Sequence, residues 1–255
     1  MTDDALAAEL RALAIEAGGA ILAVYGAGFE VRTKADASPV TAADEAAERI
    51  ILAGLARLSP GVPCVAEEAT AAHGAPELAG AAEFWLVDPL DGTREFVGRN
   101  GEFTVNIALI RGGAPALGVV HAPALGETYW CAAPGKVWRE RGGERAKVAA
   151  RCPPAGGLVA LASRSHMTAE TEAWLAARSI ASLAQAGSSL KFCRLAEGAA
   201  DVYPRLGRTM EWDIAAGHAV LAAAGGEVET LDGAPLRYGK PGFENPWFVA
   251  RGRAA

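Results

Sequence analysis

The sequence lacks several features that would place the protein in a membrane or on a nucleic acid. No uninterrupted apolar stretch reaches the roughly 18 residues that a spanning helix needs, so no transmembrane segment is predicted. The chain opens with Asp3 and Asp4, whereas a secretory leader begins with basic residues. No cluster of Lys and Arg resembles a nucleic-acid-binding arm, and the net charge is −6. A nucleic acid polymer is therefore not an expected partner.

Cysteine is scarce, with four in 255 residues and no CxxC spacing. That usage is typical of reduced, buried thiols in a cytosolic protein rather than of a disulfide framework or a zinc site. We expect a cytoplasmic protein. The sequence leaves open whether the protein rests on a membrane surface, and it does not determine the oligomeric state.

The length and hydrophobic content are those of an ordinary globular protein that forms one large globule or two lobes. The first part of the chain predicts long helices and then a meander of strands, which is typical of α+β structure. The later part alternates strands and helices, which favours an α/β layer. Cys152–Gly157 is rich in Pro and Gly and marks the expected boundary. The predicted lobes are 1–155 and 156–255.

Hydrophobic spacing predicts the individual elements. In the first lobe we expect helices at about 4–25 and 41–58, strands at 62–66, 84–87, 103–110, 116–121 and 128–131, and a loop at 69–82. In the second lobe we expect strands at 158–162, 180–184, 201–203, 227–230 and 247–250, and helices at 168–177, 188–197 and 213–224.

Four carboxylates lie where predicted elements end or begin: Glu67, Asp88, Asp91 and Asp213. Sites are commonly built at such rims of a sheet. Each acid taken alone is typical of a turn or a helix cap. Their combination favours a shared function instead.

The string DPLDGT at 88–93 adds oxygen ligands to this group. Pro89 restricts the backbone so that the two aspartates face one space, and it leaves the carbonyl of Leu90 free as a ligand. Gly92 lets a phosphate approach the backbone, and Thr93 offers a hydroxyl. Mg²⁺ prefers octahedral oxygen ligation and keeps several waters, so a few carboxylates and a substrate phosphate satisfy it.

Three segments carry a resemblance to a known family. VAEEA at 65–69, DPLDGT at 88–93 and EWDIAAG at 211–217 resemble the three sequence motifs of the inositol monophosphatase superfamily, in the same order and over nearly the whole chain. The resemblance implies a layered αβαβα sandwich and a metal-dependent, lithium-sensitive phosphatase.

Within the superfamily the chain is most similar to the 3′(2′),5′-bisphosphate nucleotidases of sulfate assimilation. The supporting segments are 94–110, 163–166, 187–206 and 245–252. Inositol monophosphatases usually have Thr-Asn-Phe where this chain has Arg-Glu-Phe at 94–96.

The resemblance also implies roles for individual residues. Two or three Mg²⁺ ions would be held by Glu67, Asp88, the Leu90 carbonyl, Asp91 and Asp213. The catalytic residues would be Asp44, Thr93 and Glu67, with Asp44 and Thr93 deprotonating the attacking water. Glu68 would lie next to the metal ligands without binding the metal directly. The substrate would be bound by Gly92, Thr93, His166, Ser188, Lys191, Arg205 and Asp213. Taken by themselves, Lys191 and Arg205 also fit solvated surface cations, and Ser188 fits a helix N-cap.

The expected function is removal of the 3′-phosphate of adenosine 3′,5′-bisphosphate, giving AMP. The alternative is an inositol or sugar monophosphatase of the same superfamily, which would share every metal ligand. A catalytically inactive, metal-sensing or nucleotide-sensing protein is disfavoured because all the carboxylates and Thr93 are present.

Overall fold

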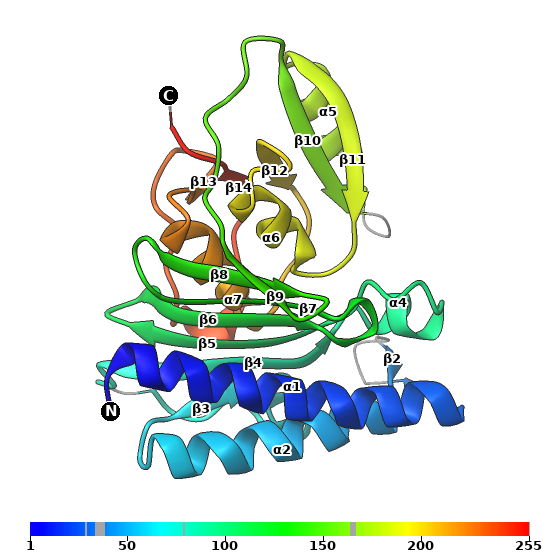
Figure 1. Ribbon diagram of the computed structural model, residues 1–255, viewed down its shortest axis with the longest axis vertical. Helices are drawn as coiled ribbons and strands as arrows, with labels where there is room; N and C mark the ends of the chain where they lie inside the picture. The colour runs from blue at the N-terminus through cyan, green and yellow to red at the C-terminus, as the bar shows by residue number, and fades with distance from the viewer. Residues whose placement is uncertain (29, 34–38, 79, 164–166, 255) are drawn as a thin grey trace.

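A computed structural model describes residues 1–28, 30–33, 39–78, 80–163 and 167–254 of the protein. Helices and sheets alternate in five layers, as expected from the sequence (Figure 1). Helices α1 and α2 form the first layer, a seven-stranded sheet the second, α6 and α7 the third, a five-stranded sheet the fourth and α5 the fifth. The two sheets thus share the helices between them.

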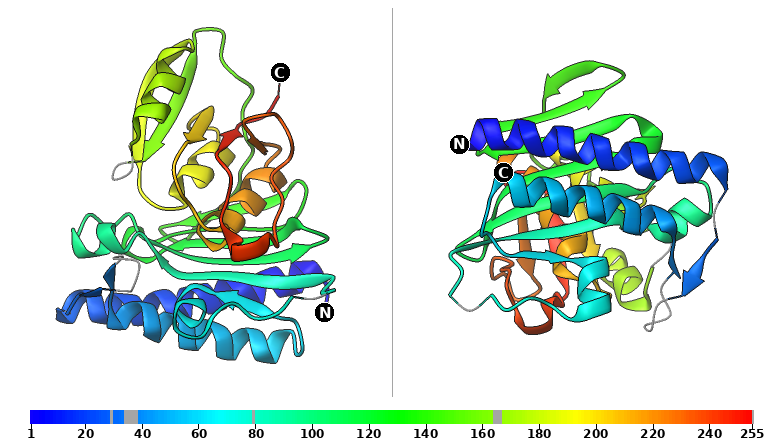
Figure 2. Two further views of the ribbon diagram at one scale, coloured as in Figure 1. Left: turned by 180° about the vertical axis from the view of Figure 1, so that it is seen from behind. Right: turned by 90° about the horizontal axis from the view of Figure 1, so that it is seen from below.

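The outer layer consists of α1 (Asp3–Ala27) and α2 (Ala42–Leu58), which lie side by side across the first sheet (Figure 2). Both follow the predicted apolar spacing. Thr41 caps α2 in a capping box, in which the Thr41 hydroxyl accepts from the helix backbone and Asp44 accepts from the Thr41 amide.

The first sheet has the strand order β3-β4-β5-β6-β7-β8-β9. β3 runs parallel to β4, and every later neighbour is antiparallel. The strands are β3 (Cys64–Ala66), β4 (Glu83–Asp91), β5 (Thr104–Arg111), β6 (Ala114–Ala122), β7 (Glu127–Ala133), β8 (Lys136–Arg141) and β9 (Glu144–Lys147). The short helix α4 (Thr93–Val97) follows β4, and a two-stranded ribbon of β1 (Arg32–Thr33) and β2 (Pro39–Val40) precedes α2.

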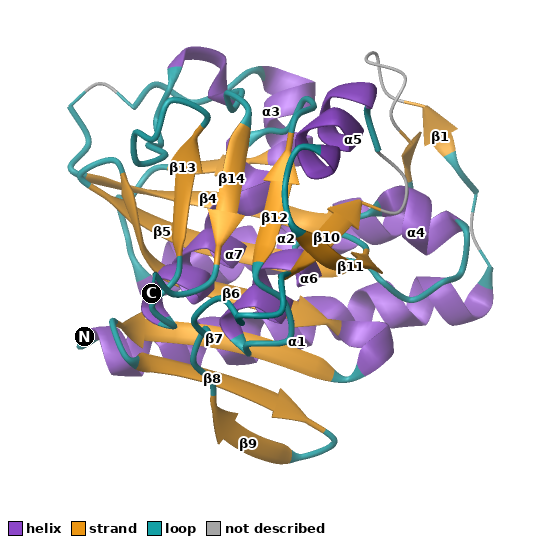
Figure 3. Cartoon of the chain, turned by 90° about the horizontal axis from the view of Figure 1, so that it is seen from above, coloured by secondary structure: helices purple, strands orange, loops and turns teal. Residues whose placement is uncertain are grey.

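The second sheet has the order β11-β10-β12-β14-β13 and mixes parallel with antiparallel pairs (Figure 3). Its strands are β10 (Leu158–Ser163), β11 (Ile180–Ala186), β12 (Val202–Arg205), β13 (Glu227–Thr230) and β14 (Phe248–Arg251). The helices of this half are α5 (Ala169–Ala176), α6 (Leu190–Ala196) and α7 (Glu211–Ala223).

Helix α7 is buried along nearly its whole length because it packs on both sheets. The largest hydrophobic cluster accordingly joins side chains of the first sheet, such as Leu86, to side chains of the second, such as Phe248. The last strand of the first sheet ends at Lys147, and the first strand of the second sheet begins at Leu158. The division into lobes 1–155 and 156–255 stays a prediction.

Several short elements differ from the sequence-based expectation. Residues 67–73 form helix α3 (Glu67–His73) where a loop was predicted from 69 onward. β4 continues through Pro89 to Asp91, although the strand was expected to stop at Asp88. β8, β9 and α4 were not predicted at all, because β8 and β9 are highly charged and α4 is barely more than one turn.

In the part of the chain that the structure describes, no helix is both long and apolar enough to cross a membrane. All four cysteines are free thiols. Cys131 and Cys193 are buried and Cys64 is partly buried, as expected, but Cys152 is exposed.

Two helical glycines provide a matched test of the packing between α6 and α7. A Cβ at Gly217 would lie 2.7 Å from the Phe192 ring, whereas a Cβ at Gly19 would have no neighbour within 4 Å. We expect Gly217→Ala to lower the free energy of unfolding by about 1–3 kcal/mol through overpacking. Gly19→Ala should raise it by about 0.5–1 kcal/mol through helix propensity. Urea denaturation of both variants measures this, and equal effects would contradict the close approach of the two helices.

Candidate metal centre and active-site pocket

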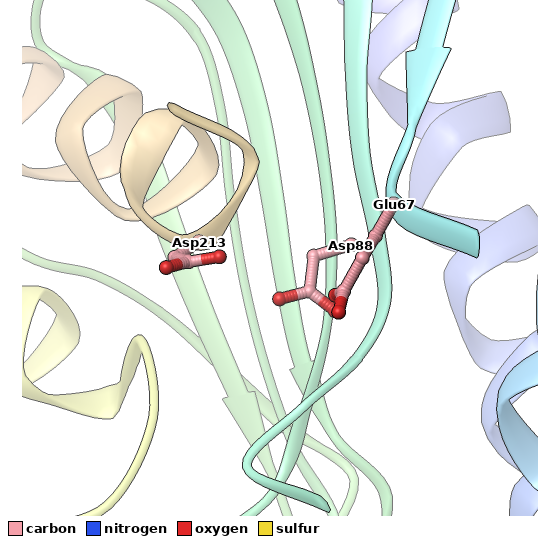
Figure 4. Close-up of side chains that lie close together, drawn as sticks. All are labelled: Glu67, Asp88 and Asp213. Carbon is pink, nitrogen blue, oxygen red and sulfur yellow. The ribbon is translucent and has the colours of Figure 1, made fainter. Parts of the chain in front are cut away.

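Three of the predicted carboxylates converge in space. One oxygen each from Glu67, Asp88 and Asp213 lies within 4.8 Å of the other two (Figure 4). Glu67 begins α3 directly after β3, Asp88 lies on β4, and Asp213 lies in the first turn of α7. The group therefore joins residues separated by nearly 150 positions in the sequence.

A bulge in β4 brings Asp91 to the same side of the sheet. Asp88 pairs with Asn106 and Asp91 with Thr104, so three steps along β4 match two steps along β5. Residues directly opposite each other share a face, and alternate residues of β5 share a face. The extra residue thus places both aspartates on one face. Pro89 lies within this bulge and beyond Val87, where the pairing of β3 with β4 ends, so among the described residues its missing N–H interrupts no ladder of the sheet.

The carboxylates at this point repel one another. Burial raises the pKa of Asp91 to about 6, and the charges of Glu95 and Glu67 add to this, while Lys191 and the backbone N–H of Ser189 oppose it. Burial, with the charges of Asp91 and Glu67, raises the pKa of Asp213 well above its ordinary value. A cation would remove this cost.

The donor set fits a hard divalent cation. It consists of oxygens alone, and the 4.8 Å span is close to the separation of about 4.2 Å between opposite ligands of an octahedral Mg²⁺. One oxygen of Asp213 accepts from the Met210 amide at 2.8 Å, and Asp88 accepts from the Leu90 amide at 3.0 Å. These bonds hold the carboxylates in place.

Helix α2 contributes two buried carboxylates one turn apart, Asp44 and Glu48. One Asp44 oxygen accepts from the amide and hydroxyl of Thr41, and the Thr93 hydroxyl lies 3.4 Å from the other oxygen. The same hydroxyl lies 3.4 Å from the carbonyl oxygen of Leu90. Thr93 thus stands between a buried carboxylate and a predicted metal ligand.

Glu48 accounts for the helix that the sequence did not predict. Its two oxygens accept from the backbone amides of Glu68 and Ala69, each at 2.8 Å. These are N-terminal amides of α3 that have no partner within the helix. Glu48 therefore stabilises α3 and fixes the orientation of Glu67. The signal in the sequence was a second acid four residues after Asp44 on an amphipathic helix.

A pocket of about 1310 Å³ opens over the carboxylates. One flank comes from α2 and α3, including Arg49 and His73, and the other from α6, β12 and α7. The predicted site residues that line it are Glu67, Glu68, Asp91, Gly92, Thr93, Ser188, Lys191, Arg205 and Asp213. His166 lies outside the described residues.

Ser188 and Lys191 do not have the environments that their alternative interpretations require. Ser188 precedes α6 by two residues and has a left-handed φ of 47°, so it is not the N-cap. Lys191 is buried, and its ammonium donates to the carbonyls of Ser188 at 2.7 Å and Ala186 at 3.2 Å. Burial lowers the pKa of Lys191 to about 8, while Asp91 opposes that shift. Lys191 is not a solvated surface cation. Its role in substrate binding stays a prediction.

Arg205 lies on β12 with its guanidinium at the pocket. One Nη donates to the Arg208 carbonyl at 3.0 Å, and the buried Nε has no hydrogen-bond partner among the described residues. A guanidinium with spare donors in a pocket is suited to an anionic oxygen.

Besides Glu48, sequence reasoning missed Asn106, Ser189 and Arg208. The amide nitrogen of Asn106 lies 3.1 Å from the Ser189 hydroxyl and 3.5 Å from an Asp91 oxygen. Arg208 lines the pocket. No sequence signal marked Asn106, because it sits in an otherwise ordinary buried strand.

Comparison with known proteins gives a consistent result. A family model described as "Inositol monophosphatase family" matches residues 3–248. The 3′(2′),5′-bisphosphate nucleotidase CysQ of Escherichia coli K12 is 50% identical over 241 residues, which cover 92% of this chain and 95% of that protein. The nucleotidase CysQ of Haemophilus influenzae is 31% identical, covering 94% of this chain and 90% of that protein.

Solved structures agree with these sequence relatives. The crystal structure of CysQ from Bacteroides thetaiotaomicron is 36% identical and superposes with a TM-score of 0.80 over 94% of both chains. An inositol monophosphatase from Anabaena sp. PCC 7120 gives 0.78 at 24% identity, covering 97% of this chain and 90% of that one, and shows a shared fold.

The charge repulsion at the centre generates a prediction for the metal-free protein. A carboxyl whose folded pKa lies above its unfolded value binds more protons when folded, so the stability that it contributes falls as pH rises from about 4 to about 6. At pH 8 the metal-free Asp91→Asn variant should therefore be more stable than wild type. The gain should be at most about 3 kcal/mol, because one pKa unit corresponds to about 1.36 kcal/mol.

Magnesium should reverse that order. At 100 times its dissociation constant it should stabilise wild type by about 2.7 kcal/mol for one site, and Asp91→Asn by much less. Thermal melts at pH 5 and pH 8, with chelator or with Mg²⁺, measure both effects. If Mg²⁺ left the melting temperature of wild type unchanged, that result would contradict a metal centre at these carboxylates.

Proposed function

The chain belongs to the inositol monophosphatase family, and we propose that it is a metal-dependent 3′(2′),5′-bisphosphate nucleotidase. It hydrolyses the 3′-phosphate ester of adenosine 3′,5′-bisphosphate and releases AMP and inorganic phosphate. The observation that carries this is a carboxylate centre on the floor of a pocket that also contains Arg205, in a chain 50% identical to a nucleotidase of that name.

The proposed ions are Mg²⁺, two or three in number. Glu67, Asp88, the Leu90 carbonyl, Asp91 and Asp213 hold them. When bound, they supply positive charge that lowers the pKa of water and stabilises the leaving oxygen. The support is a set of oxygen donors at one place and the raised pKa values of Asp91 and Asp213.

Thr93 and Asp44 remove the proton of the attacking water. The Thr93 hydroxyl accepts a hydrogen bond from the water and donates its own hydrogen to Asp44. A buried carboxylate beside a hydroxyl can draw the proton away as the water attacks phosphorus. Glu67 orients the same water, and Glu48 supports Glu67 by accepting from the backbone amides of the two residues that follow it. The support is the contact of 3.4 Å between Thr93 and Asp44 and the paired bonds from Glu48 to α3.

The substrate lies across the pocket from the carboxylates towards β12. The cleaved phosphate sits over Gly92, Thr93 and Asp213, where Gly92 presents backbone without a side chain. Arg205 binds the phosphate that is not cleaved, and Lys191 adds positive charge between the two. His166 and Ser188 belong to the same proposed substrate-binding set. Arg205 is suited to this role because its Nε has no partner in the described part of the chain.

A phosphate-release assay with Mg²⁺ tests the assignment. It compares adenosine 3′,5′-bisphosphate, adenosine 3′-monophosphate, inositol 1-phosphate and fructose 1,6-bisphosphate at matched concentrations. We expect the highest kcat/KM on adenosine 3′,5′-bisphosphate. A higher kcat/KM on inositol 1-phosphate would show that the protein is an inositol monophosphatase instead. The carboxylates cannot distinguish the two activities, because both would use the same ones.

Arg205 should distinguish substrates by their second phosphate. A charge-assisted hydrogen bond contributes about 1.5–3 kcal/mol, which is roughly 10- to 150-fold in kcat/KM. We expect Arg205→Gln to lose that much on adenosine 3′,5′-bisphosphate and little on adenosine 3′-monophosphate.

Two further variants serve as controls for this comparison. Asp213→Asn should damage both reactions equally, because Asp213 serves the cleaved phosphate. Lys191→Ala should also lower kcat/KM on both, because the Lys191 charge faces Asp91. Equal losses from Arg205→Gln on the two substrates would contradict its assignment to the uncleaved phosphate.

Lithium should inhibit the enzyme. Li⁺ is small and prefers oxygen ligands, so it can occupy a Mg²⁺ position, but its single charge polarises water less. We expect inhibition by millimolar Li⁺ in the same phosphate-release assay, with Na⁺ at equal ionic strength as the control. If Li⁺ left the activity undiminished with Mg²⁺ near its activation midpoint, the protein would not be one of the lithium-sensitive enzymes of the family.

A further inference from the structure

A segment that follows β13, residues 239–245, lies against the first turn of α7. The Glu211 carboxylate is completely buried there and accepts from the backbone amides of Gly239 at 2.7 Å and Lys240 at 2.9 Å. The Lys240 ammonium lies 2.6 Å from the same carboxylate and donates to the side-chain oxygen of Asn245 at 3.2 Å. These contacts join the segment to the start of α7.

Asn245 holds the two residues that precede α7. Its backbone amide donates to the Thr209 carbonyl at 2.9 Å, and its side-chain amide donates to the Met210 carbonyl at 2.7 Å. The Asn245 side chain is buried, and the bond from Lys240 to its oxygen keeps its amide nitrogen directed at Met210. The position of the Met210 peptide group therefore depends on Asn245.

The Met210 amide in turn holds a proposed metal ligand. It donates to one carboxylate oxygen of Asp213 at 2.8 Å, and Asp213 lies beside Asp88 and Glu67 (Figure 4). Met210 is the N-cap residue of α7, a position that Ser, Thr, Asp or Asn usually occupies. Because the Met sulfur is only a weak acceptor, contacts from elsewhere in the chain are needed to fix this end of the helix.

We propose that Asn245 is a positioning residue for metal binding, which orients the Asp213 carboxylate by holding the Met210 peptide group. The inference rests on the proposed metal-dependent function. Asn245 is not a catalytic residue, because among the described residues the pocket is lined by Thr209, Met210 and Asp213 but not by Asn245. Asn245 lies behind that lining and acts through it.

The support adds no net charge beside the carboxylates. Glu211 lies two positions before Asp213, and an uncompensated buried acid there would add to the repulsion at the centre. The Lys240 ammonium compensates the Glu211 charge. Asn245 then contacts Met210 with a neutral amide. The Asp213 carboxylate is thus held in place without further negative charge around it.

A second contact between the same two parts of the chain provides a control. The Tyr238 hydroxyl lies 2.9 Å from Nδ1 of His218, which is buried and lies more than one turn beyond Asp213 on α7. Tyr238→Phe removes this buried hydrogen bond and should lower the melting temperature. It should leave metal affinity unchanged, because it does not touch the residues before α7.

Titration with Mn²⁺ alone tests the proposal without turnover. Mn²⁺ takes the same oxygen ligands as Mg²⁺, and free Mn²⁺ is counted by electron paramagnetic resonance. Partners that orient a metal ligand contribute roughly 10- to 100-fold in metal affinity. For Asn245→Ala we expect a loss of about 10-fold, the lower end of that range, because Asn245 acts through the Met210 backbone. Asn245→Leu, which keeps the side-chain volume, should show the same loss, and melting curves identify the folded variants.

A double-mutant cycle with Asp213→Ala shows whether Asn245 acts through Asp213. Asp213→Ala should itself weaken Mn²⁺ binding, because it removes a charged ligand. Adding Asn245→Ala to that variant should change Mn²⁺ affinity by less than about twofold, since no carboxylate remains at 213 to be oriented. A general loosening of the fold would instead weaken binding equally in both backgrounds.

Wild-type Mn²⁺ affinity in both Asn245 variants would overturn the proposal. An equal loss of affinity in Tyr238→Phe, or an undiminished loss in the Asp213→Ala background, would also overturn it. If Asp213→Ala left Mn²⁺ binding unchanged, the metal centre and the proposal would both be wrong. The titration contains no nucleotide, so a different preferred substrate in the phosphate-release assay would refute the nucleotidase assignment and leave this result standing.

Discussion

Mutual repulsion among clustered carboxylates is the constraint on which the rest of the structure depends. Glu67, Asp88, Asp91 and Asp213 gain nothing from proximity in the metal-free protein. Burial first, and then the neighbouring carboxylates, raise the pKa values of Asp91 and Asp213. The surrounding fold must therefore hold them together. It does so with backbone amides, capping bonds and the packing of α7 between two sheets. Packing of the hydrophobic core provides the free energy that holds the carboxylates together. A bound cation would remove the repulsion among them.

The support comes from both halves of the chain. On one side, α2 supplies Glu48 behind Glu67 and Asp44 beside Thr93. On the other side, the turn before α6 reaches across to Asp91 while α7 carries Asp213. Because the largest hydrophobic cluster runs through α7 into both sheets, the centre forms only when the two halves are packed together.

The sequence predicted the parts of the structure that are encoded locally. The long helices and the meander follow apolar spacing. Glu67, Asp91 and Asp213 stand at or within one turn of element ends, while Asp88 lies inside β4. The string DPLDGT contains its bulge, its ligands and its glycine within six residues. What it did not predict depends on distant partners. Helix α3 needs the carboxylate of Glu48, and the strained φ of Ser188 is imposed by carbonyls some 90 residues earlier. No local pattern can report such contacts.

The bulge in β4 decides which face of the sheet each aspartate meets. In a regular strand, residues an odd number of positions apart point to opposite faces, so Asp88 and Asp91 would lie on opposite sides of the sheet. Three steps along β4 match two steps along β5, and this change of parity turns both carboxylates to the same side. The same four residues in an unbulged strand would leave the centre with only one of the two carboxylates.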